Sequence, residues 1–335
     1  MREALFYKKR KDNTVVCRLC PKACVIKQDR AGYCRVRENR EGVLYTLNYG
    51  RCTSCSVDPM EKKPLYHFYP AHTILSLGTF GCNLHCSFCQ NWEIAHGSPP
   101  AVSLEPERVA AMVGAQGPRC TGVAYTYSEP MVWYEFVRDT ARLVSEAGYK
   151  NVLVTNGMVN EKPLKEILPY IDALNIDVKA FRDDFYKKTC AGRLQPVKKT
   201  VAWAREKCHV EVTTLIVTGL NDSEQELGEL VEWLSGLDPD MPLHLSRYFP
   251  NFEMDRPPTP PDTLRRALRI ARERLNYVYL GNIQGEGAGD TLCPACGTVV
   301  ISRTGYTARN RAFEDGKCAV CGNHIPIKGT VWREK

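Results

Sequence analysis

Six short apolar runs alternate with longer amphipathic segments, and this alternation constrains the fold more than any other feature of the chain. The strand-like runs lie at residues 74–78, 122–127, 151–155, 173–178, 210–217 and 243–248. Helical patterns lie at residues 106–113, 132–147, 162–168, 195–207, 223–234 and 261–275. Repeated strand–helix alternation predicts a parallel sheet with crossover helices. We therefore expect an α/β fold of six such units, with a further strand at 277–280 at the sheet edge.

Polar motifs follow the apolar runs at the points where the predicted strands end. A three-cysteine loop follows the first run, and Tyr127-Ser-Glu-Pro130 and Thr155-Asn-Gly157 follow the next two. Asp177-Val-Lys179 closes the fourth run, and His244-Leu-Ser-Arg247 lies in the sixth. A (β/α) barrel gathers its chemistry at the C-terminal ends of its strands. The sequence therefore predicts one site, at one mouth of a barrel.

The three cysteines of the first loop, Cys82, Cys86 and Cys89, have the spacing C-x3-C-x2-C. Three thiolates on a short loop suit one [4Fe-4S] cluster in which one iron has no protein ligand. A closed zinc site needs a fourth ligand, usually from C-x2-C pairs, and His85 does not lie at a usual ligand spacing. The spacing therefore favours a cluster with one iron open to a small molecule.

A second group of cysteines lies in the segment 1–71, which we treat as a Cys-rich N-terminal metal-binding unit. Its members are Cys17, Cys20, Cys24 and Cys34, spaced C-x2-C-x3-C-x9-C. Four thiolates within 18 residues can close around zinc, which stabilises cores too small to fold by themselves. Zinc is the favoured interpretation, and a second iron–sulfur cluster is the alternative. Cys52 and Cys55 can join either site or be ordinary loop thiols.

The tail, residues 285–335, contains two further C-x2-C pairs, at Cys293 with Cys296 and at Cys318 with Cys321. Each pair is followed by glycine, and this arrangement is typical of a zinc ribbon. We expect a zinc clip that holds a small C-terminal unit behind the barrel domain, 72–284. A role in gripping a macromolecular partner, or a metal other than zinc, is the alternative. Cys190 stands alone after the fourth strand, where it can approach the site mouth.

Composition narrows the setting of the protein. The chain has 16 cysteines, most of them grouped at metal-ligand spacings, and its basic N-terminus lacks the apolar core of a secretory signal. We therefore expect a cytoplasmic, oxygen-sensitive metalloprotein with no membrane span. The net charge of +7 falls to roughly +2 once two four-thiolate zinc sites and one three-thiolate cluster are counted. A nucleic-acid partner is accordingly not the favoured interpretation.

The run Gly81-Cys-Asn-Leu-His-Cys-Ser-Phe-Cys-Gln-Asn91 resembles the radical S-adenosylmethionine (SAM) superfamily, with Phe88 where the superfamily has an aromatic residue beside adenine. More closely, the chain resembles the radical SAM enzyme of the AmmeMemoRadiSam system, which is similar to pyruvate formate-lyase-activating enzyme. The resemblance also rests on Cys17-Arg-Leu-Cys-Pro-Lys-Ala-Cys24, Asp58-Pro-Met-Glu-Lys-Lys-Pro-Leu-Tyr-His-Phe68, Asn175-Ile-Asp-Val-Lys-Ala180 and Tyr277-Val-Tyr-Leu-Gly-Asn282. Two features depart from it: Ser128 stands where the family has Asn, and the pair Cys52 and Cys55 is additional.

The resemblance implies a partial (β/α)6 TIM barrel of the radical SAM type that binds one [4Fe-4S] cluster and SAM. It implies an electron donor such as ferredoxin or flavodoxin, and an association with Memo-like and AMMECR-type proteins. A site of this kind needs contacts to each part of SAM. We expect Phe88 beside the adenine, and Glu129 to accept from the amino group with Ser128 orienting it. Thr155 and Asn156 are expected at ribose or carboxylate oxygens, where Gly157 permits a close approach of the backbone. Asp177 is expected at the ribose, His244 at the ribose or the methionine part, and Lys179 or Arg247 at the carboxylate.

The leading hypothesis is therefore an enzyme that cleaves SAM reductively and uses the 5′-deoxyadenosyl radical on an unidentified substrate. That substrate can be a protein, a nucleotide or a small metabolite. A narrower alternative is an activase that acts on a protein glycine of a glycyl-radical enzyme. The contrasting class is a zinc-binding adaptor without catalysis, which would have no need of an open iron.

Overall fold

An eight-stranded sheet forms the centre of the molecule. The order across it is β17-β16-β15-β14-β13-β12-β10-β9. Its strands are β9 (Ser54–Pro59), β10 (Thr73–Gly78), β12 (Cys120–Tyr125), β13 (Lys150–Thr155), β14 (Ala173–Asp177), β15 (His209–Ile216), β16 (Leu243–Arg247) and β17 (Val278–Gly281). All neighbouring pairs are parallel except β9 with β10. This computed structural model describes residues 1–283, 285 and 287–333, so the expected domain boundary at 284 lies outside them.

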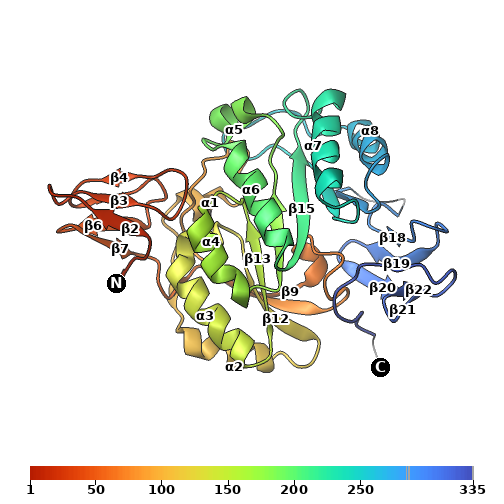
Figure 1. Cartoon of the computed structure of the whole chain (residues 1–335), viewed down its shortest axis with the longest axis horizontal. Helices are drawn as coiled ribbons and strands as arrows, with labels where there is room; N and C mark the ends of the chain where they lie inside the picture. The colour runs from red at the N-terminus through yellow and green to blue at the C-terminus, as the bar shows by residue number, and fades with distance from the viewer. Residues whose placement is uncertain (284, 286, 334–335) are drawn as a thin grey trace.

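Helices cover the outside of this sheet (Figure 1). They are α1 (Trp92–His96), α2 (Pro106–Gly114), α3 (Tyr134–Glu146), α4 (Glu161–Ile167), α5 (Asp183–Thr189), α6 (Leu194–Arg205), α7 (Glu224–Leu237) and α8 (Pro261–Arg272). Three 3-10 turns are η1 (Met60–Lys62), η2 (Pro130–Trp133) and η3 (Leu168–Tyr170). The expected α/β fold with six strand–helix units and an added edge strand is confirmed. The antiparallel strand β9 and the short helices α1 and α5 were not expected. No described helix combines the length and apolarity that crossing a membrane requires.

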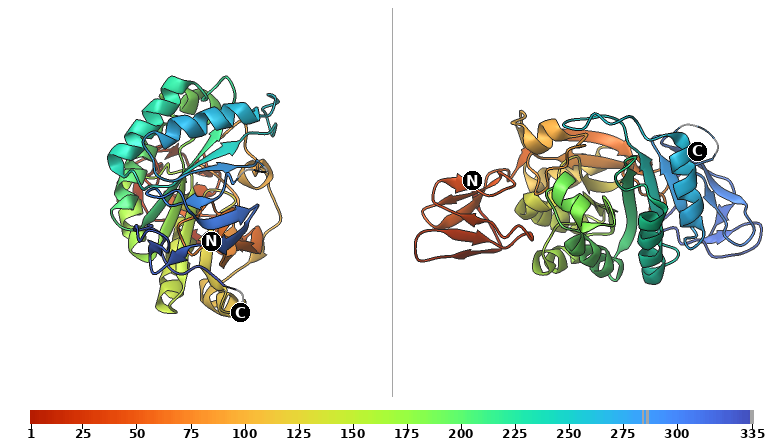
Figure 2. Two further views of the ribbon diagram at one scale, coloured as in Figure 1. Left: turned by 90° about the vertical axis from the view of Figure 1, so that its right-hand side faces the viewer. Right: turned by 90° about the horizontal axis from the view of Figure 1, so that it is seen from above.

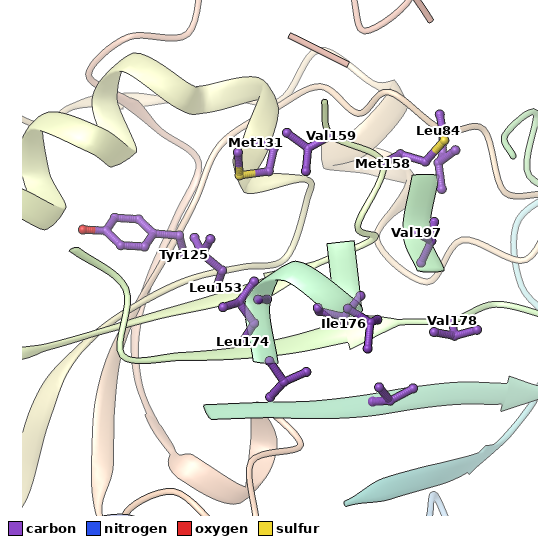
Figure 3. Packing of buried hydrophobic residues seen from close by; sticks show 14 of the residues in the cluster. Leu84, Tyr125, Met131, Leu153, Met158, Val159, Leu174, Ile176, Val178 and Val197 are labelled. Carbon is purple, nitrogen blue, oxygen red and sulfur yellow. The ribbon is translucent and has the colours of Figure 1, made fainter. Parts of the chain in front are cut away.

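The space between sheet and helices is filled by branched and aromatic side chains. Figure 3 shows Leu153, Leu174 and Ile176 of the strands in one buried cluster with Val197 of α6 and Leu84 of the three-cysteine loop. These residues are almost completely buried. The loop that carries the cysteines is thus anchored in the same core as the barrel strands, which fixes its position by packing.

The parallel register brings the strand ends together at one edge. Thr155 at the end of β13 lies opposite Ile176 of β14, and Asp177 at the end of β14 lies opposite Thr213 of β15. Segments that follow these ends therefore emerge side by side, as in other barrels built from parallel strands.

Two small β units flank the barrel at opposite ends of the long axis (Figures 1 and 2). The N-terminal unit contains β1 (Arg2–Glu3), β2 (Tyr7–Lys9), β3 (Val15–Cys17), β4 (Val25–Ile26), β5 (Arg30–Ala31), β6 (Arg37–Arg40) and β7 (Val43–Thr46). These strands form a four-stranded and a three-stranded antiparallel sheet. A two-stranded pair of β8 (Arg51–Cys52) and β11 (Val102–Ser103) follows. Because β9 belongs to the barrel sheet, the second half of the segment 1–71 packs with the barrel rather than with the N-terminal strands.

The C-terminal unit contains β18 (Thr291–Leu292), β19 (Val299–Thr304), β20 (Thr307–Asn310), β21 (Phe313–Glu314) and β22 (Lys317–Cys318). It contacts the barrel through Arg303, whose guanidinium donates to the carbonyl oxygen of Tyr66 at 2.7 Å and stacks on the ring of that tyrosine. The backbone N–H of Tyr69 also donates to the carbonyl oxygen of Lys328, at 2.9 Å. The tail is therefore packed against the segment that precedes β10.

A buried ion pair fastens the N-terminal unit to helix α3. Arg37 of β6 and Glu135 of α3 are in contact, and both side chains are 1% exposed. The same Glu135 carboxylate accepts the backbone N–H of Leu5 at 2.7 Å, and the Arg37 guanidinium donates to the carbonyl oxygen of Leu5 at 2.8 Å. A buried pair is costly to break from one side, because the remaining charge is left without compensation.

We expect Glu135→Gln to lower the free energy of unfolding by about 3 kcal/mol, because it leaves the buried Arg37 guanidinium without its counter-charge. Urea unfolding followed by circular dichroism measures the change. The matched control is Glu146→Gln in the same helix, whose partner Arg142 is exposed and whose pair should contribute less than about 1 kcal/mol. Equal losses for the two variants would contradict this role of the pair.

Candidate active site

A pocket of about 330 Å³ opens at the C-terminal ends of the parallel strands. Cys82, Cys86 and Cys89 line it together, from the loop that follows β10. Seven of the other residues expected at the site line the same pocket: Phe88, Ser128, Glu129, Thr155, Asn156, Asp177 and Lys179. The strand ends therefore bring three thiols and a set of polar side chains to one cavity.

The spacing of the three thiols suits a cluster better than a single ion. Among the described residues, the tail cysteines alone form a group of three or more possible ligands whose atoms all lie within 4.8 Å of one another. A tetrahedral ion with bonds of about 2.3 Å would hold its sulfur ligands roughly 3.8 Å apart. The Cys82, Cys86 and Cys89 thiols line one cavity without all three coming within 4.8 Å of one another. Three thiolates with an open position are the donor set of a [4Fe-4S] cluster that leaves one iron without a protein ligand.

Glu129 is the buried acid of the pocket. Its carboxylate accepts the hydroxyl of Thr155 at 2.7 Å and the backbone N–H groups of Asn156 at 2.8 Å and Met131 at 2.9 Å. Burial raises the pKa of Glu129 to about 7, and the hydrogen bonds from Asn156 and Thr155 oppose that rise. The carboxylate is held rigidly, and a cationic ligand group would favour its ionised form.

Asn156 connects the acid to the cysteines. Its amide nitrogen donates to the Cys82 sulfur at 3.6 Å and to the side-chain oxygen of Asn83 at 2.9 Å. Its own backbone N–H is one of the donors to Glu129. Asn156 therefore positions both the Glu129 carboxylate and the Cys82 sulfur. Residues that hydrogen-bond to metal ligands commonly orient those ligands in this way.

Asp177 and Lys179 form an ion pair across the pocket wall, with Nζ and Oδ2 2.5 Å apart. Burial opposes the charge of Lys179, but the Asp177 carboxylate raises the pKa of Lys179 above its ordinary value. The ammonium group is therefore kept protonated beside the Cys86 thiol. The pair supplies both signs of charge within one cavity.

Two further side chains on the wall are held by internal contacts. The hydroxyl of Ser128 donates to the carbonyl oxygen of Thr79 at 2.5 Å. Phe88 is buried and packs near Phe185 of α5, with ring centroids 6.1 Å apart. Ser128 is thus already engaged with the backbone in this structure, while Phe88 presents an apolar wall.

The structure does not place Gly157, His244 or Arg247 on the wall of this pocket. The φ angle of Gly157 is +71°, a region that favours glycine. His244 is buried against Glu211, with Nε2 and Oε2 2.6 Å apart, and Arg247 donates to the carbonyl oxygen of Thr259 at 2.7 Å. In the sixth strand the residue that reaches the pocket is Ser246, which lies between these two.

His244 belongs to a separate buried network. The Glu211 carboxylate also approaches His209 Nε2 at 2.9 Å and accepts the backbone N–H groups of Tyr66 and His67. Hydrogen bonds from His209 and His244, and their electrostatic interaction with the carboxylate, hold the pKa of Glu211 below its ordinary range, against the effect of burial. The network joins the strands to the segment before β10, and in this structure the His244 ring is engaged there rather than in the pocket.

Sequence reasoning missed several residues of the pocket wall, among them Lys62, Asn91, Thr213, Asn282 and Tyr306. Lys62 lies in the motif from Asp58 to Phe68, and the resemblance of this motif to a known family could have marked Lys62 as a site residue. Tyr306 sits between β19 and β20, in the turn of a tail hairpin, and no local pattern connects it to the barrel mouth. The C-terminal unit therefore contributes a residue to the pocket wall as well as packing against the segment before β10.

Cys190, at the end of α5, lies beside the cysteine loop. Its thiol contacts that of Cys86, and this hydrogen bond, together with burial, raises the pKa of Cys86. The carbonyl oxygen of Cys190 accepts the backbone N–H of His85 at 2.9 Å. Cys190 is fully buried, so its thiol faces the cluster loop rather than solvent.

The tail cysteines form a compact four-sulfur site. Cys293 lies 3.5 Å from Cys321, and Cys296 lies 3.8 Å from Cys318, measured between sulfur atoms. These separations are close to those around one tetrahedral ion. The N-terminal cysteines Cys17, Cys20, Cys24 and Cys34 instead line a second, small pocket without such contacts. Cys52 is buried and Cys55 is exposed.

Comparison with known proteins agrees with this geometry. A family model described as the radical SAM superfamily matches residues 76–234. An uncharacterized protein of Methanocaldococcus jannaschii is 44% identical over 336 residues, covering 98% of this chain and 99% of its own. The pyruvate formate-lyase 1-activating enzyme of Escherichia coli is 23% identical over 159 residues, which are 46% of this chain and 65% of that enzyme.

A solved structure supports the fold. The crystal structure of Streptococcus suis SuiB bound to S-adenosylmethionine aligns with a TM-score of 0.51 at 14% identity, over 67% of this chain and 53% of that one. The matched family model and the three-cysteine loop at the strand ends lead to one assignment. The chain belongs to the radical SAM superfamily.

Proposed function

We propose that this protein is an enzyme that binds a [4Fe-4S] cluster and SAM and cleaves SAM reductively to act on another molecule. The observation that carries the proposal is the joint presence of Cys82, Cys86, Cys89 and the buried acid Glu129 in one pocket at the strand ends. A zinc adaptor without catalysis would need neither an incomplete thiol set nor a buried acid beside it.

Different residues of the pocket would hold the cluster and SAM. Cys82, Cys86 and Cys89 would ligate three irons. The bound cluster and SAM would together supply a 5′-deoxyadenosyl radical by one-electron cleavage of the sulfonium. Glu129 would accept a charge-assisted hydrogen bond from the amino group of SAM. Lys179 would attract the SAM carboxylate, and Asp177, Thr155 and Asn156 would accept or donate at the ribose. Phe88 would pack against the adenine.

The outer wall of the pocket is the substrate side. Lys62 is half-exposed there, and its ammonium lies 2.8 Å from the Asp58 carboxylate. Tyr127 donates to the same carboxylate at 2.6 Å, and the exposed Tyr306 of the tail completes the wall. This polar, aromatic opening suits a polar substrate, such as a peptide segment or a nucleotide.

The similarity to the pyruvate formate-lyase 1-activating enzyme supports a second candidate, in which the substrate is a glycine of a partner protein. The AmmeMemoRadiSam resemblance supports a finer assignment, with Memo-like and AMMECR-type proteins as partners and ferredoxin or flavodoxin as electron donor.

The metal sites need reduced thiols, so we place the protein in the cytoplasm. We assign one zinc ion to the tail cysteines, and propose that the barrel domain and the two flanking metal-binding units act together.

We expect Cys89→Ala to abolish SAM cleavage, because a cube held by two thiolates loses its third anchor. The measurement is formation of 5′-deoxyadenosine by the anaerobically reconstituted, dithionite-reduced protein, together with its iron content. The control is Cys208→Ala, which removes a thiol outside the pocket. Undiminished cleavage by the Cys89 variant would rule out the proposed cluster.

We expect Glu129→Gln to raise the dissociation constant for SAM by about tenfold or more, because a hydrogen bond to a charged group contributes roughly 1.5–3 kcal/mol. Equilibrium dialysis with reconstituted protein measures the change. Glu226→Gln is the control, since Glu226 is equally buried but lies at the start of α7. An unchanged affinity in the Glu129 variant would contradict the assigned contact.

The pKa of Glu129, raised to about 7, adds a pH dependence. Above that value the carboxylate is ionised and attracts the SAM ammonium; below it the neutral acid does not. The dissociation constant should therefore rise as the pH falls through about 7 in the native protein and stay flatter in Glu129→Gln. If the dissociation constants of the two proteins changed with pH in the same way, Glu129 would not be the group whose ionisation controls SAM binding.

A further inference from the structure

The N-terminal cysteine set has an arrangement that the proposed function does not explain. Cys17, Cys20, Cys24 and Cys34 all line one small pocket where the N-terminal unit meets the barrel. Asn83 of the cluster loop and Val132 of η2 complete its wall. Four thiols converging on one enclosed space at a unit boundary are a ligand set without an assigned ligand.

The tail site and the cluster site of the same chain serve as internal references for the spacing of these thiols. The tail sulfurs approach one another to 3.5 and 3.8 Å, as one zinc ion requires. Within the part of the chain that the structure describes, no three of the N-terminal cysteines gather within 4.8 Å, and neither do Cys82, Cys86 and Cys89. The N-terminal thiols are therefore spaced more widely than the tail thiols, as thiolates around a cage of iron and sulfide would be.

The surroundings of the N-terminal pocket suit an anionic cluster. The backbone N–H of Tyr33 donates to the Cys24 sulfur at 3.4 Å, as Leu84 N–H does to Cys82 in the first site. Two basic side chains, Lys22 and Arg37, line the pocket. Hydrogen bonds to sulfur and nearby charge both set the reduction potential of an iron–sulfur cluster.

The two cysteine sets are neighbours. Asn83, on the wall of the N-terminal pocket, interacts with the Cys20 thiol and accepts a hydrogen bond from Asn156 at 2.9 Å. Asn156 also donates to the Cys82 sulfur. A Cβ on Gly81 would lie 2.9 Å from the carbonyl oxygen of Cys34, so the start of the cluster loop packs directly on the N-terminal set. Two amide side chains are the bridge between the sulfur ligands of the two sites.

We propose that Cys17, Cys20, Cys24 and Cys34 bind a second [4Fe-4S] cluster, fully ligated by protein, that passes electrons to the SAM-binding cluster. An external one-electron carrier, an iron–sulfur or flavin protein, reduces this cluster from the 2+ to the 1+ state. The electron then moves to the first cluster, which becomes 1+ while the second returns to 2+. No bond of SAM is broken in this step. The inference rests on the proposed function only in that the electron acceptor is the SAM-binding cluster at Cys82, Cys86 and Cys89.

Metal analysis of the full-length, anaerobically reconstituted protein tests the assignment. We expect about eight irons and one zinc per chain, since two cubes and one tail site would be filled. The triple variant Cys82→Ala, Cys86→Ala and Cys89→Ala should keep about four irons. Its dithionite-reduced electron paramagnetic resonance signal should not change when SAM is added. The matched control is Cys296→Ser, which should lose zinc and keep the iron of the native protein.

A triple variant that contains no iron and two zinc ions per chain would overturn the assignment. SAM cleavage by the native protein tests the proposed function separately, so the two failures can be told apart. If the triple variant does not fold, the native protein decides: about four irons and two zinc ions per chain contradict the second cluster.

The relay has its own readout, the ratio of SAM cleavage supported by reduced flavodoxin to that supported by dithionite. We expect Cys20→Ser to lower this ratio at least tenfold, because the protein donor loses its route while a small reductant can reach the first cluster through the pocket. An unchanged ratio in a variant that has lost the second cluster would overturn the relay.

Discussion

The structure depends on how one loop is held at the end of the first barrel strand. The backbone N–H groups of His85 and Ser87 donate to the carbonyl oxygens of Cys190 and Thr189, at the C-terminal end of α5. Asn83 donates to the carbonyl oxygen of Met158 at 2.6 Å, and Leu84 is buried in the barrel core. Backbone hydrogen bonds and packing thus fix the position of the loop. Three thiols can therefore converge on one cavity without a fourth cysteine in the loop itself.

The polar half of the site follows from the same parallel sheet. Because β12 and β13 are paired neighbours, the segment after β12 places Glu129 against Thr155 at the end of β13 and against Asn156, the next residue. The acid is buried and still accepts three hydrogen bonds, so its carboxylate has a fixed direction and a pKa that responds to a bound cation. Asn156 then connects this acid to the Cys82 sulfur and, through Asn83, to the N-terminal unit. The barrel edge couples cofactor binding to both cysteine sets.

Sequence reasoning located the barrel because its apolar runs and helical patterns are local and periodic, and the parallel order follows from their alternation. It also located residues at or shortly after strand ends, such as Asp177 at the end of β14 and Glu129 four residues after β12. It could not locate contributions that depend on distant packing. Tyr306 reaches the pocket from a tail hairpin, and β9 joins the sheet edge from the N-terminal part of the chain. Ser246, rather than His244 or Arg247, lines the pocket because of which face of β16 meets the cavity. The side chain of His244 is occupied by Glu211, a buried acid that no local motif reveals.

The most direct test of the open iron is electron–nuclear double resonance of the dithionite-reduced protein with SAM labelled by ¹⁵N at its amino group. If three cysteines leave one iron free for SAM, the cluster signal will show a hyperfine coupling to that nitrogen, and the coupling will be absent without SAM. A reduced cluster that shows no coupling although SAM is bound would mean that a protein side chain, such as Cys190, completes its ligation, and the proposed chemistry at this site would be contradicted.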